Sequence, residues 1–175
     1  MPLKVRRVVT GHDSEGRAVV VTDGLPPQCG VDPEVHVGIA ELWATSEFPV
    51  CNIGNQEAVP DPLPIAPESR GTVFRMVEFP PEQEESANTE AVQAYLRKQG
   101  TVTPEQTRHP GMHKTHTIDY AVVVSGRIDL LLDEQEVTLQ AGDTVVQRGT
   151  FHAWANRYAE PCLVAFILVA AAPAT

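Results

Sequence analysis

Short runs of alternating hydrophobic and polar residues fill most of the chain, and this pattern is densest in its second half. Alternation with a period of two is typical of strands that bury one face, because successive side chains point to opposite sides. From His116 onward we expect these short strands: Asp119–Val124, Arg127–Leu132, Glu136–Leu139, Thr144–Gln147, His152–Asn156 and Leu163–Val169. Strands so short and so closely spaced predict an all-β antiparallel sandwich or barrel.

The first half of the chain predicts a β-hairpin, further strands and an irregular segment. Its expected strands are Val5–Val9, Arg17–Thr22, Val35–Ala44 and Thr72–Phe79. The first two flank a turn-rich stretch at residues 11–16, which is typical of a hairpin. Pro49–Ser69 is rich in proline, asparagine and acids, and we expect it to run as a strap over the barrel. We therefore divide the chain into an N-terminal β extension packed on the barrel (residues 1–70) and the barrel itself (residues 71–175).

One segment has a helical period instead. Within Ser86–Gln99, Ala91 and Tyr95 lie four residues apart, as do Val92 and Leu96, so each pair shares one helix face. Basic residues near its end suit the helix dipole, and the glycine that follows is a common stop signal. We expect one short helix that packs a thin apolar face on the barrel.

The charge and the cysteines restrict the partners and the compartment. The 175 residues carry a net charge of -10, with 23 acidic and 13 basic side chains, so nucleic acid and anionic membrane surfaces are disfavoured as partners. The 3 cysteines lack metal-binding spacing, and free thiols are typical of a reducing cytoplasm. The apolar run Cys162–Ala172 is too short to span a bilayer as a helix. We expect a soluble cytoplasmic protein.

Candidate chemistry is concentrated between Gly111 and Asn156. His113 and Asp119 lie on one expected strand, and His152 returns from a second. If the first strand is regular, residues 113, 115, 117 and 119 share one face, whereas His116 lies on the other. Two imidazoles and one carboxylate can hold a divalent transition metal and leave its other coordination positions open.

These residues resemble the motifs of the cupin superfamily, which consists of small jelly-roll barrels. The first cupin motif runs G-x5-H-x-H-x3,4-E-x6-G, and His113, Asp119 and Gly126 match it. The second runs G-x5-P-x-G-x2-H-x3-N, and the matching residues are Gly142, Gly149, His152 and Asn156. The resemblance implies a cupin-type double-stranded β-helix over roughly residues 71–170 with a metal inside the barrel.

The chain departs from the family pattern at two ligand positions. Thr115 stands where the second histidine is usual, and Asp119 replaces a glutamate with a side chain one carbon shorter. The matching residues therefore imply a two-histidine, one-carboxylate set of His113, Asp119 and His152. Such a set suits Fe, and it also accepts Mn, Zn or Ni.

The pocket around such a metal would be lined by residues that share its faces. We expect these pocket residues to be Thr115, Gln147, Trp154, Arg75 and Phe166. Trp154 lies on the same face as His152, while Ala153 and Ala155 face the other side. Phe74 and Met76 are further expected residues of the core or pocket wall. Arg75 or Arg148 could bind a substrate carboxylate, and placement at the surface or rim is the alternative for both.

Two functions from different classes are compatible with these residues. The first is a metal-dependent cupin enzyme that acts on a small organic molecule as a dioxygenase, decarboxylase or isomerase. The second is a non-catalytic cupin module that binds or senses a small molecule. We also expect a homodimer, because the hairpin has no assigned place in the barrel and could pair with a partner subunit.

Overall fold

The chain folds into strands and one short helix, seen in a computed structural model that describes residues 3–54, 59, 64–82 and 89–173. The elements are β1 (Arg7–His12), β2 (Ala18–Gly24), β3 (Cys29–Val31), β4 (Gly38–Thr45), β5 (Thr72–Phe79), α1 (Thr89–Lys98), β6 (Thr117–Ser125), β7 (Arg127–Leu131), β8 (Glu136–Gln140), β9 (Thr144–Gln147), β10 (Ala153–Ala155) and β11 (Cys162–Ala170). The helix is the only one among the described residues, and it is too short to cross a membrane.

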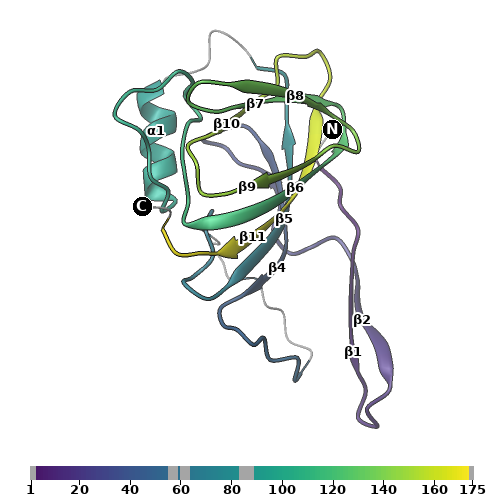
Figure 1. Cartoon of the computed structure of the whole chain (residues 1–175). Helices are drawn as coiled ribbons and strands as arrows, with labels where there is room; N and C mark the ends of the chain where they lie inside the picture. The colour runs from purple at the N-terminus through teal and green to yellow at the C-terminus, as the bar shows by residue number, and fades with distance from the viewer. Residues whose placement is uncertain (1–2, 55–58, 60–63, 83–88, 174–175) are drawn as a thin grey trace.

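The strands form three antiparallel sheets. A six-stranded sheet has the order β3-β4-β5-β11-β6-β9, a three-stranded sheet has the order β10-β7-β8, and β1 pairs with β2 alone. The two larger sheets close around a common core to form the barrel (Figure 1). The predicted all-β jelly-roll fold with one short helix is therefore confirmed.

The core follows from the alternation on two long neighbouring strands. On β6 the odd-numbered residues from Thr117 to Val123 are buried, and on β11 the even-numbered residues from Cys162 to Leu168 are buried. They pack against Ile128 and other residues of the three-stranded sheet. Each fully buried aliphatic side chain stabilises the barrel by about 1.5–3 kcal/mol.

The six-stranded sheet extends across the boundary expected at residue 70. β4 pairs with β5 from Gly38 opposite Glu78 to Thr45 opposite Thr72. The register shifts between Glu41 and Trp43, which is a bulge that changes the direction in which the following side chains point. β3 adds an edge strand that the sequence pattern does not predict, because three residues are too few to show a period.

The β1–β2 hairpin is confirmed and projects away from the barrel (Figure 1). At its base, the guanidinium of Arg7 donates a hydrogen bond of 2.9 Å to the carbonyl oxygen of Leu42. Leu3 packs against Ala40 and Leu42 on the outer side of β4. The N-terminal segment is thereby fixed to the barrel, whereas the rest of the hairpin is largely exposed.

The helix ends where the sequence predicts and lies beside the barrel. Gly100 has a φ of 81°, and its N–H donates to the carbonyl of Arg97, so this glycine stops the helix in a left-handed conformation. The expected start at Ser86 lies outside the described residues. Gln93, Tyr95 and Leu96 are the buried side chains of the helix.

Phe74 does not lie in the core as expected. It is 39% exposed on the outer face of β5, because Val73, Arg75 and Val77 take the inward positions on either side of it. The turn after β6 uses Gly126 at a φ of 80°, and a Cβ atom there would lie 2.6 Å from the carbonyl oxygen of Pro161. Both conformation and space therefore require the motif glycine.

Candidate metal and ligand site

The structure brings His113 and His152 side by side. Each backbone N–H donates to the other residue's carbonyl, at 3.0 and 2.9 Å, and the ring centroids are 4.6 Å apart. Both residues lie just outside the regular strands, in an isolated bridge. The single strand expected to carry both His113 and Asp119 is wrong, because regular pairing is interrupted at Thr115 and His116 and β6 begins at Thr117.

Backbone carbonyls fix the orientation of both imidazole rings. Nδ1 of His113 lies 2.8 Å from the carbonyl oxygen of Gly111, and Nδ1 of His152 lies 3.0 Å from that of Thr150. A carbonyl oxygen can only accept a hydrogen bond, so in each neutral ring Nδ1 carries the proton. The lone pair is then on Nε2, as a metal ligand requires.

Burial keeps the two imidazoles neutral. The pKa of His152 is lowered to about 3. Burial is the main cause, and the neighbouring His113 acts in the same direction. Burial also lowers the pKa of His113, against the opposing effect of its hydrogen bond to Gly111. Near pH 7 neither ring is protonated, so both can donate a lone pair to a cation.

Asp119 faces the barrel interior with an unsatisfied carboxylate. It is 5% exposed, and among the described residues its Oδ1 atom has no hydrogen-bond partner. Burial raises the pKa of Asp119 to about 6, although the Thr117 hydroxyl and the Arg75 charge act in the opposite direction. A buried carboxylate oxygen without a donor is costly, so this position favours a cation or a ligand that donates a proton.

These side chains supply part of the ligand set that a divalent transition metal needs. No three His, Cys, Asp or Glu side chains in the described ranges are close enough together to hold an ion. The predicted set of His113, Asp119 and His152 is therefore not assembled as a complete coordination sphere. Two neutral imidazoles are in place, and Asp119 contributes an unsatisfied oxygen in the same barrel.

Thr115 and Gln147 support the loops around the histidines. The hydroxyl of Thr115, which is buried, shares a hydrogen bond of 2.5 Å with the Thr117 hydroxyl. Gln147 lies opposite Asp119 across β6 and β9, and its amide donates to the hydroxyl and the carbonyl of Thr150. That carbonyl also holds the His152 ring, so Gln147 is a positioning residue for His152.

Three aromatic rings pack together beside the histidines. The centroid of Trp154 lies 6.4 Å from that of His152, 5.2 Å from that of Phe166 and 6.4 Å from that of Phe79. Their edge and stacked contacts make this part of the barrel apolar. As predicted, Ala153 and Ala155 lie on the other side of β10, where they pack with Met112 and Leu131.

Arg75 lies inside the barrel in a buried ion pair. Its Nε donates to Glu41 Oε2 at 3.1 Å, and its Nη2 donates to the carbonyl of Pro64 at 2.9 Å. Both side chains are less than a tenth exposed. Burial lowers the pKa of Arg75 and raises that of Glu41, while their mutual attraction opposes both shifts. The alternative placement of Arg75 at the surface or rim is wrong.

The sequence pattern does not single out Glu41 or Phe79. Glu41 is the only charged residue of β4, and it lies opposite Arg75 of β5. A single acid in one apolar strand and a base in a nearby one could have indicated a buried pair. Phe79 lies at the end of β5, where the alternating pattern gave no direction for its side chain.

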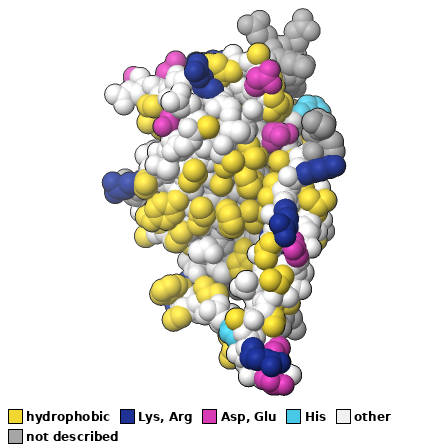
Figure 2. Space-filling view, turned by 90° about the vertical axis from the view of Figure 1, so that its right-hand side faces the viewer, with side chains coloured by type: hydrophobic (Ala, Val, Ile, Leu, Met, Phe, Trp, Pro, Cys, Tyr) yellow, Lys and Arg dark blue, Asp and Glu magenta, His cyan; other side chains and the backbone are white. Residues whose placement is uncertain are grey.

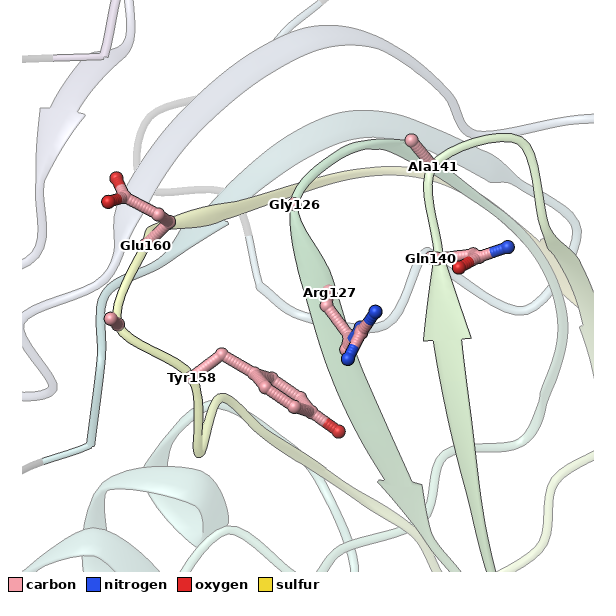
Figure 3. A pocket seen from close by; sticks show the side chains of 7 residues that line it. Gly126, Arg127, Gln140, Ala141, Tyr158 and Glu160 are labelled. Atoms are coloured by element: carbon pink, nitrogen blue, oxygen red, sulfur yellow. The ribbon is translucent and has the colours of Figure 1, made fainter.

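Two recesses can be described on the outer surface of the part of the barrel that the structure describes. A shallow pocket of about 430 Å³ lies away from the histidines, and Arg127 stacks over the Tyr158 ring in it at 5.3 Å (Figure 3). A smaller pocket of about 130 Å³ adjoins the start of β6. Its lining includes Thr115, His116 and Arg148, so it is the recess that reaches a predicted pocket residue.

The helix and one motif residue hold the segments that carry the site. The Gln93 amide donates to the carbonyls of Pro110 and Met112, directly before His113. The Asn156 amide donates to the carbonyls of Phe79 and Glu160, so it ties the turn after β10 to the end of β5. The motif asparagine therefore has a structural role here, and His116 is exposed.

Several fungal proteins are similar to this chain in sequence. It is 33% identical over 160 residues to phomopsin biosynthesis cluster protein C' of Diaporthe leptostromiformis, covering 86% of this chain and 70% of that protein. It is 28% identical over 156 residues to the cupin-domain-containing oxidoreductase fogC of Aspergillus ruber, covering 87% of this chain and 64% of that protein. The chain thus spans about two thirds of these relatives.

A family profile and a solved structure complete the comparison. A cupin domain from Schizosaccharomyces pombe superposes with a TM-score of 0.47 and 14% identity over 96% of this chain and 89% of that chain. The profile of the Cupin domain family matches residues 98–169, which include both motifs and both histidines. The chain belongs to the cupin superfamily.

Proposed function

We propose that this protein is a metal-dependent cupin enzyme of the oxidoreductase type that acts on a small organic molecule in the barrel. The observation that carries the proposal is the pair of neutral imidazoles, 4.6 Å apart, whose Nε2 lone pairs are directed by carbonyl contacts at Nδ1. Such preorganised rings suit Fe, Mn, Zn or Ni. The cupin-domain oxidoreductases among its relatives support this reaction class.

In this proposal His113 and His152 are the first two ligands, and Asp119 is the third. Asp119 would reach the metal through a water molecule or by a change of rotamer, which would also satisfy its Oδ1 atom. When bound, the metal would supply Lewis acidity or redox chemistry at its open positions. The two imidazoles need no deprotonation to bind, because burial already keeps them neutral.

The surrounding residues would bind the substrate and exclude water. Trp154 and Phe166 would contact its apolar part, since their rings form the wall next to His152. Arg75 would attract a polar or anionic group, with Glu41 holding the guanidinium in position. Asp119 could move a proton at its Oδ1 atom, because a pKa of about 6 is close to neutral pH.

Metal analysis of the protein purified without chelators tests this proposal. We expect close to one equivalent of a transition metal in the wild type and near none in His113→Ala and His152→Ala. His116→Ala is the matched control, since this histidine lies in the same segment but is exposed on the outer face. Wild-type protein that stays folded and binds none of Fe, Mn, Zn and Ni would refute the proposal.

The role of Asp119 can be tested on the cobalt-substituted protein. Co(II) absorbs visible light in a way that depends on its ligands, so the spectrum reports coordination without any knowledge of the substrate. If Asp119 contributes to binding, Asp119→Asn will weaken Co(II) affinity by about 10–100-fold. An unchanged spectrum and affinity would remove Asp119 from the ligand set.

A non-catalytic module that binds a small molecule is the second candidate. The observation that favours it is the incomplete donor set, since no group of three metal-binding side chains is assembled among the described residues. Thr115, where a histidine is usual, points the same way. This reading predicts a folded, metal-free protein that still binds apolar ligands, and quenching of Trp154 fluorescence would report such binding.

A further inference from the structure

The turn that leads into His113 is closed by a histidine side chain. Residues 109–112 form a tight turn, in which the N–H of Met112 donates to the carbonyl oxygen of His109 at 3.0 Å. Nδ1 of His109 accepts a second hydrogen bond of 3.0 Å, from the backbone N–H of Gly111. This arrangement resembles an Asx turn, in which a side-chain oxygen accepts the N–H two residues further on. His109 therefore holds the turn with both its backbone and its side chain.

The other ring nitrogen of His109 is held by a carboxylate. Nε2 of His109 lies 2.9 Å from Oε1 of Glu82. A backbone N–H can only donate, so the Gly111 contact leaves the lone pair of His109 on Nδ1 and the proton on Nε2, which donates a hydrogen bond to Glu82. Glu82 is itself fixed, because its backbone N–H donates to the carbonyl of Asn156 at 2.8 Å. The His109 ring thus connects the turn to the segments that follow β5 and β10.

Gly111 is the residue that needs this support. Its carbonyl oxygen lies 2.8 Å from Nδ1 of His113 and selects the tautomer of that ring. Glycine has the widest backbone freedom of the residues, so this carbonyl keeps its direction only if the adjoining peptide groups are fixed. The side chain of His109 accepts from the Gly111 N–H, and its carbonyl accepts from the Met112 N–H, which shares a planar peptide group with the Gly111 carbonyl. His109 therefore fixes both peptide groups of Gly111.

The two candidate ligands are held in the same way. Nδ1 of His152 lies against the carbonyl of Thr150, which accepts a hydrogen bond of 3.2 Å from the Gln147 amide. Nδ1 of His113 lies against a carbonyl whose peptide group is held by His109. In each case a residue that is not a ligand orients a carbonyl, and the carbonyl orients the imidazole. Both ring nitrogens of His109 are engaged in these contacts, and its side chain is only 18% exposed.

We propose that His109 is a positioning residue for His113. With Glu82 holding its ring, His109 keeps the Gly111 carbonyl in place, so that Nδ1 of His113 retains its proton and Nε2 retains a lone pair. The inference rests on the proposed function, because that lone pair has a use only if the barrel binds a cation. His109 acts through the backbone and does not itself touch the metal.

Nitrogen-15 NMR of the metal-free protein tests the proposal, because the shifts of the two ring nitrogens show which one carries the proton. We expect the Nδ1–H form of His113 in the wild type and a mixture of the two tautomers in His109→Ala. His109→Asn is the rescue variant, since its Oδ1 atom can accept from the Gly111 N–H as in an Asx turn, and it should keep the wild-type form. His152 is the internal reference, because Gln147 holds its carbonyl, and its tautomer should not change.

Titration with Co(II) measures the consequence for metal binding. His109→Ala should weaken Co(II) affinity by about 10–100-fold and change the visible spectrum, whereas His109→Asn should stay within about threefold of the wild type. Glu82→Ala should lie between these two variants, because the ring then loses one of its two contacts. Arg108→Ala is the matched control, since it removes the neighbouring ion pair with Glu136 and leaves the turn intact.

Thermal melting followed by circular dichroism shows which variants are folded. A His113 tautomer that is unchanged in folded His109→Ala overturns the proposal, as does His109→Asn that behaves like His109→Ala. An equal change in the His152 tautomer also overturns it, since the substitution would then disturb the whole site. If His109→Ala does not fold, Glu82→Ala repeats the test at a side chain that is 39% exposed. Wild-type protein that binds no Co(II) but shows the expected tautomers refutes the proposed function and still supports the role of His109.

Discussion

The two faces of the six-stranded sheet depart in different ways from a sheet with one solvated face, because the inner face combines the apolar core with buried polar side chains and the outer face is largely apolar. Its inner face carries Glu41, Arg75, Asp119 and Gln147, all of which are buried. Its outer face carries valines and aromatic side chains that are partly exposed. Figure 2 shows hydrophobic side chains gathered in a broad patch on the barrel surface above the projecting hairpin. Antiparallel sheets commonly bury the apolar face and leave the polar face in water.

The inner face thus combines residues that stabilise the barrel with residues that we propose bind a ligand. The apolar part of the core, with Val123, Val164 and Ile128, is sufficient to hold the two sheets together. Buried charges beside it add little net stability, since desolvation offsets their attraction. In the proposed function, these buried charges serve to bind a metal and a substrate.

The largest effect should come from disrupting the buried ion pair on the inner face. Arg75→Met leaves the Glu41 carboxylate buried without a counter-charge and should lower the free energy of unfolding by about 3–5 kcal/mol. The double variant Glu41→Leu/Arg75→Met removes both charges and should recover most of that loss. Urea denaturation measures both values. A loss below about 1 kcal/mol for Arg75→Met would show that water reaches the pair.

Substitutions of two neighbouring β11 residues compare how much each face of the sheet contributes to the free energy of unfolding. Leu168 is 5% exposed on the inner face, so Leu168→Ala should lower the free energy of unfolding by about 2–5 kcal/mol. Ile167 points outward, and Ile167→Ala should lower it by only about 1 kcal/mol when the protein is dilute. Equal losses at low concentration would mean that both faces of β11 are covered within a single chain.

Acid titration of the metal-free protein tests how Asp119 and His152 on the inner face affect its stability. Asp119 has a raised pKa of about 6, so it lowers stability as the pH rises from about 4 to 6. His152 has a lowered pKa of about 3, so it lowers stability as the pH falls from about 6.5 to 3. In the wild type these slopes oppose each other.

Asp119→Asn removes one of the two slopes. The variant should lose about 2 kcal/mol more than the wild type between pH 6.5 and 4, as judged by urea denaturation at each pH in the presence of a chelator. Asp129→Asn is the control, because this buried carboxylate accepts hydrogen bonds from Thr138 and Tyr158 outside the site. Parallel pH profiles for Asp119→Asn and the wild type would contradict the role of Asp119.

The smallest effect concerns the outer face. If that face is buried between two copies, the midpoint of thermal unfolding rises by a few degrees when the protein concentration is raised 100-fold. Val122→Lys on the outer face of β6 should remove this dependence, whereas Val137→Lys on β8 of the other sheet should keep it. Differential scanning calorimetry at two concentrations measures the shift, and a midpoint that is independent of concentration in the wild type argues against the homodimer expected from the sequence.

Much of the barrel could be predicted because its strands have a period of two and clear turn residues. Thr72–Phe79 and Thr144–Gln147 have the predicted bounds, and the other predicted strands differ by a few residues at their ends. Parity predicted that Asp119 of β6 faces inward, where it is buried. The bulge after Glu41 could not be predicted, because a shift of register depends on the neighbouring strand.

The sequence by itself determined the fold class, the cupin motifs and the identity of the two histidines, because these depend on local spacing along single strands. Only the tertiary structure decided that His113 and His152 are neighbours, that Asp119 remains unsatisfied, and that Arg75 pairs with Glu41 inside the barrel. Those contacts join residues 34 or more positions apart. Their distances are set by how the sheets close, which no local pattern records.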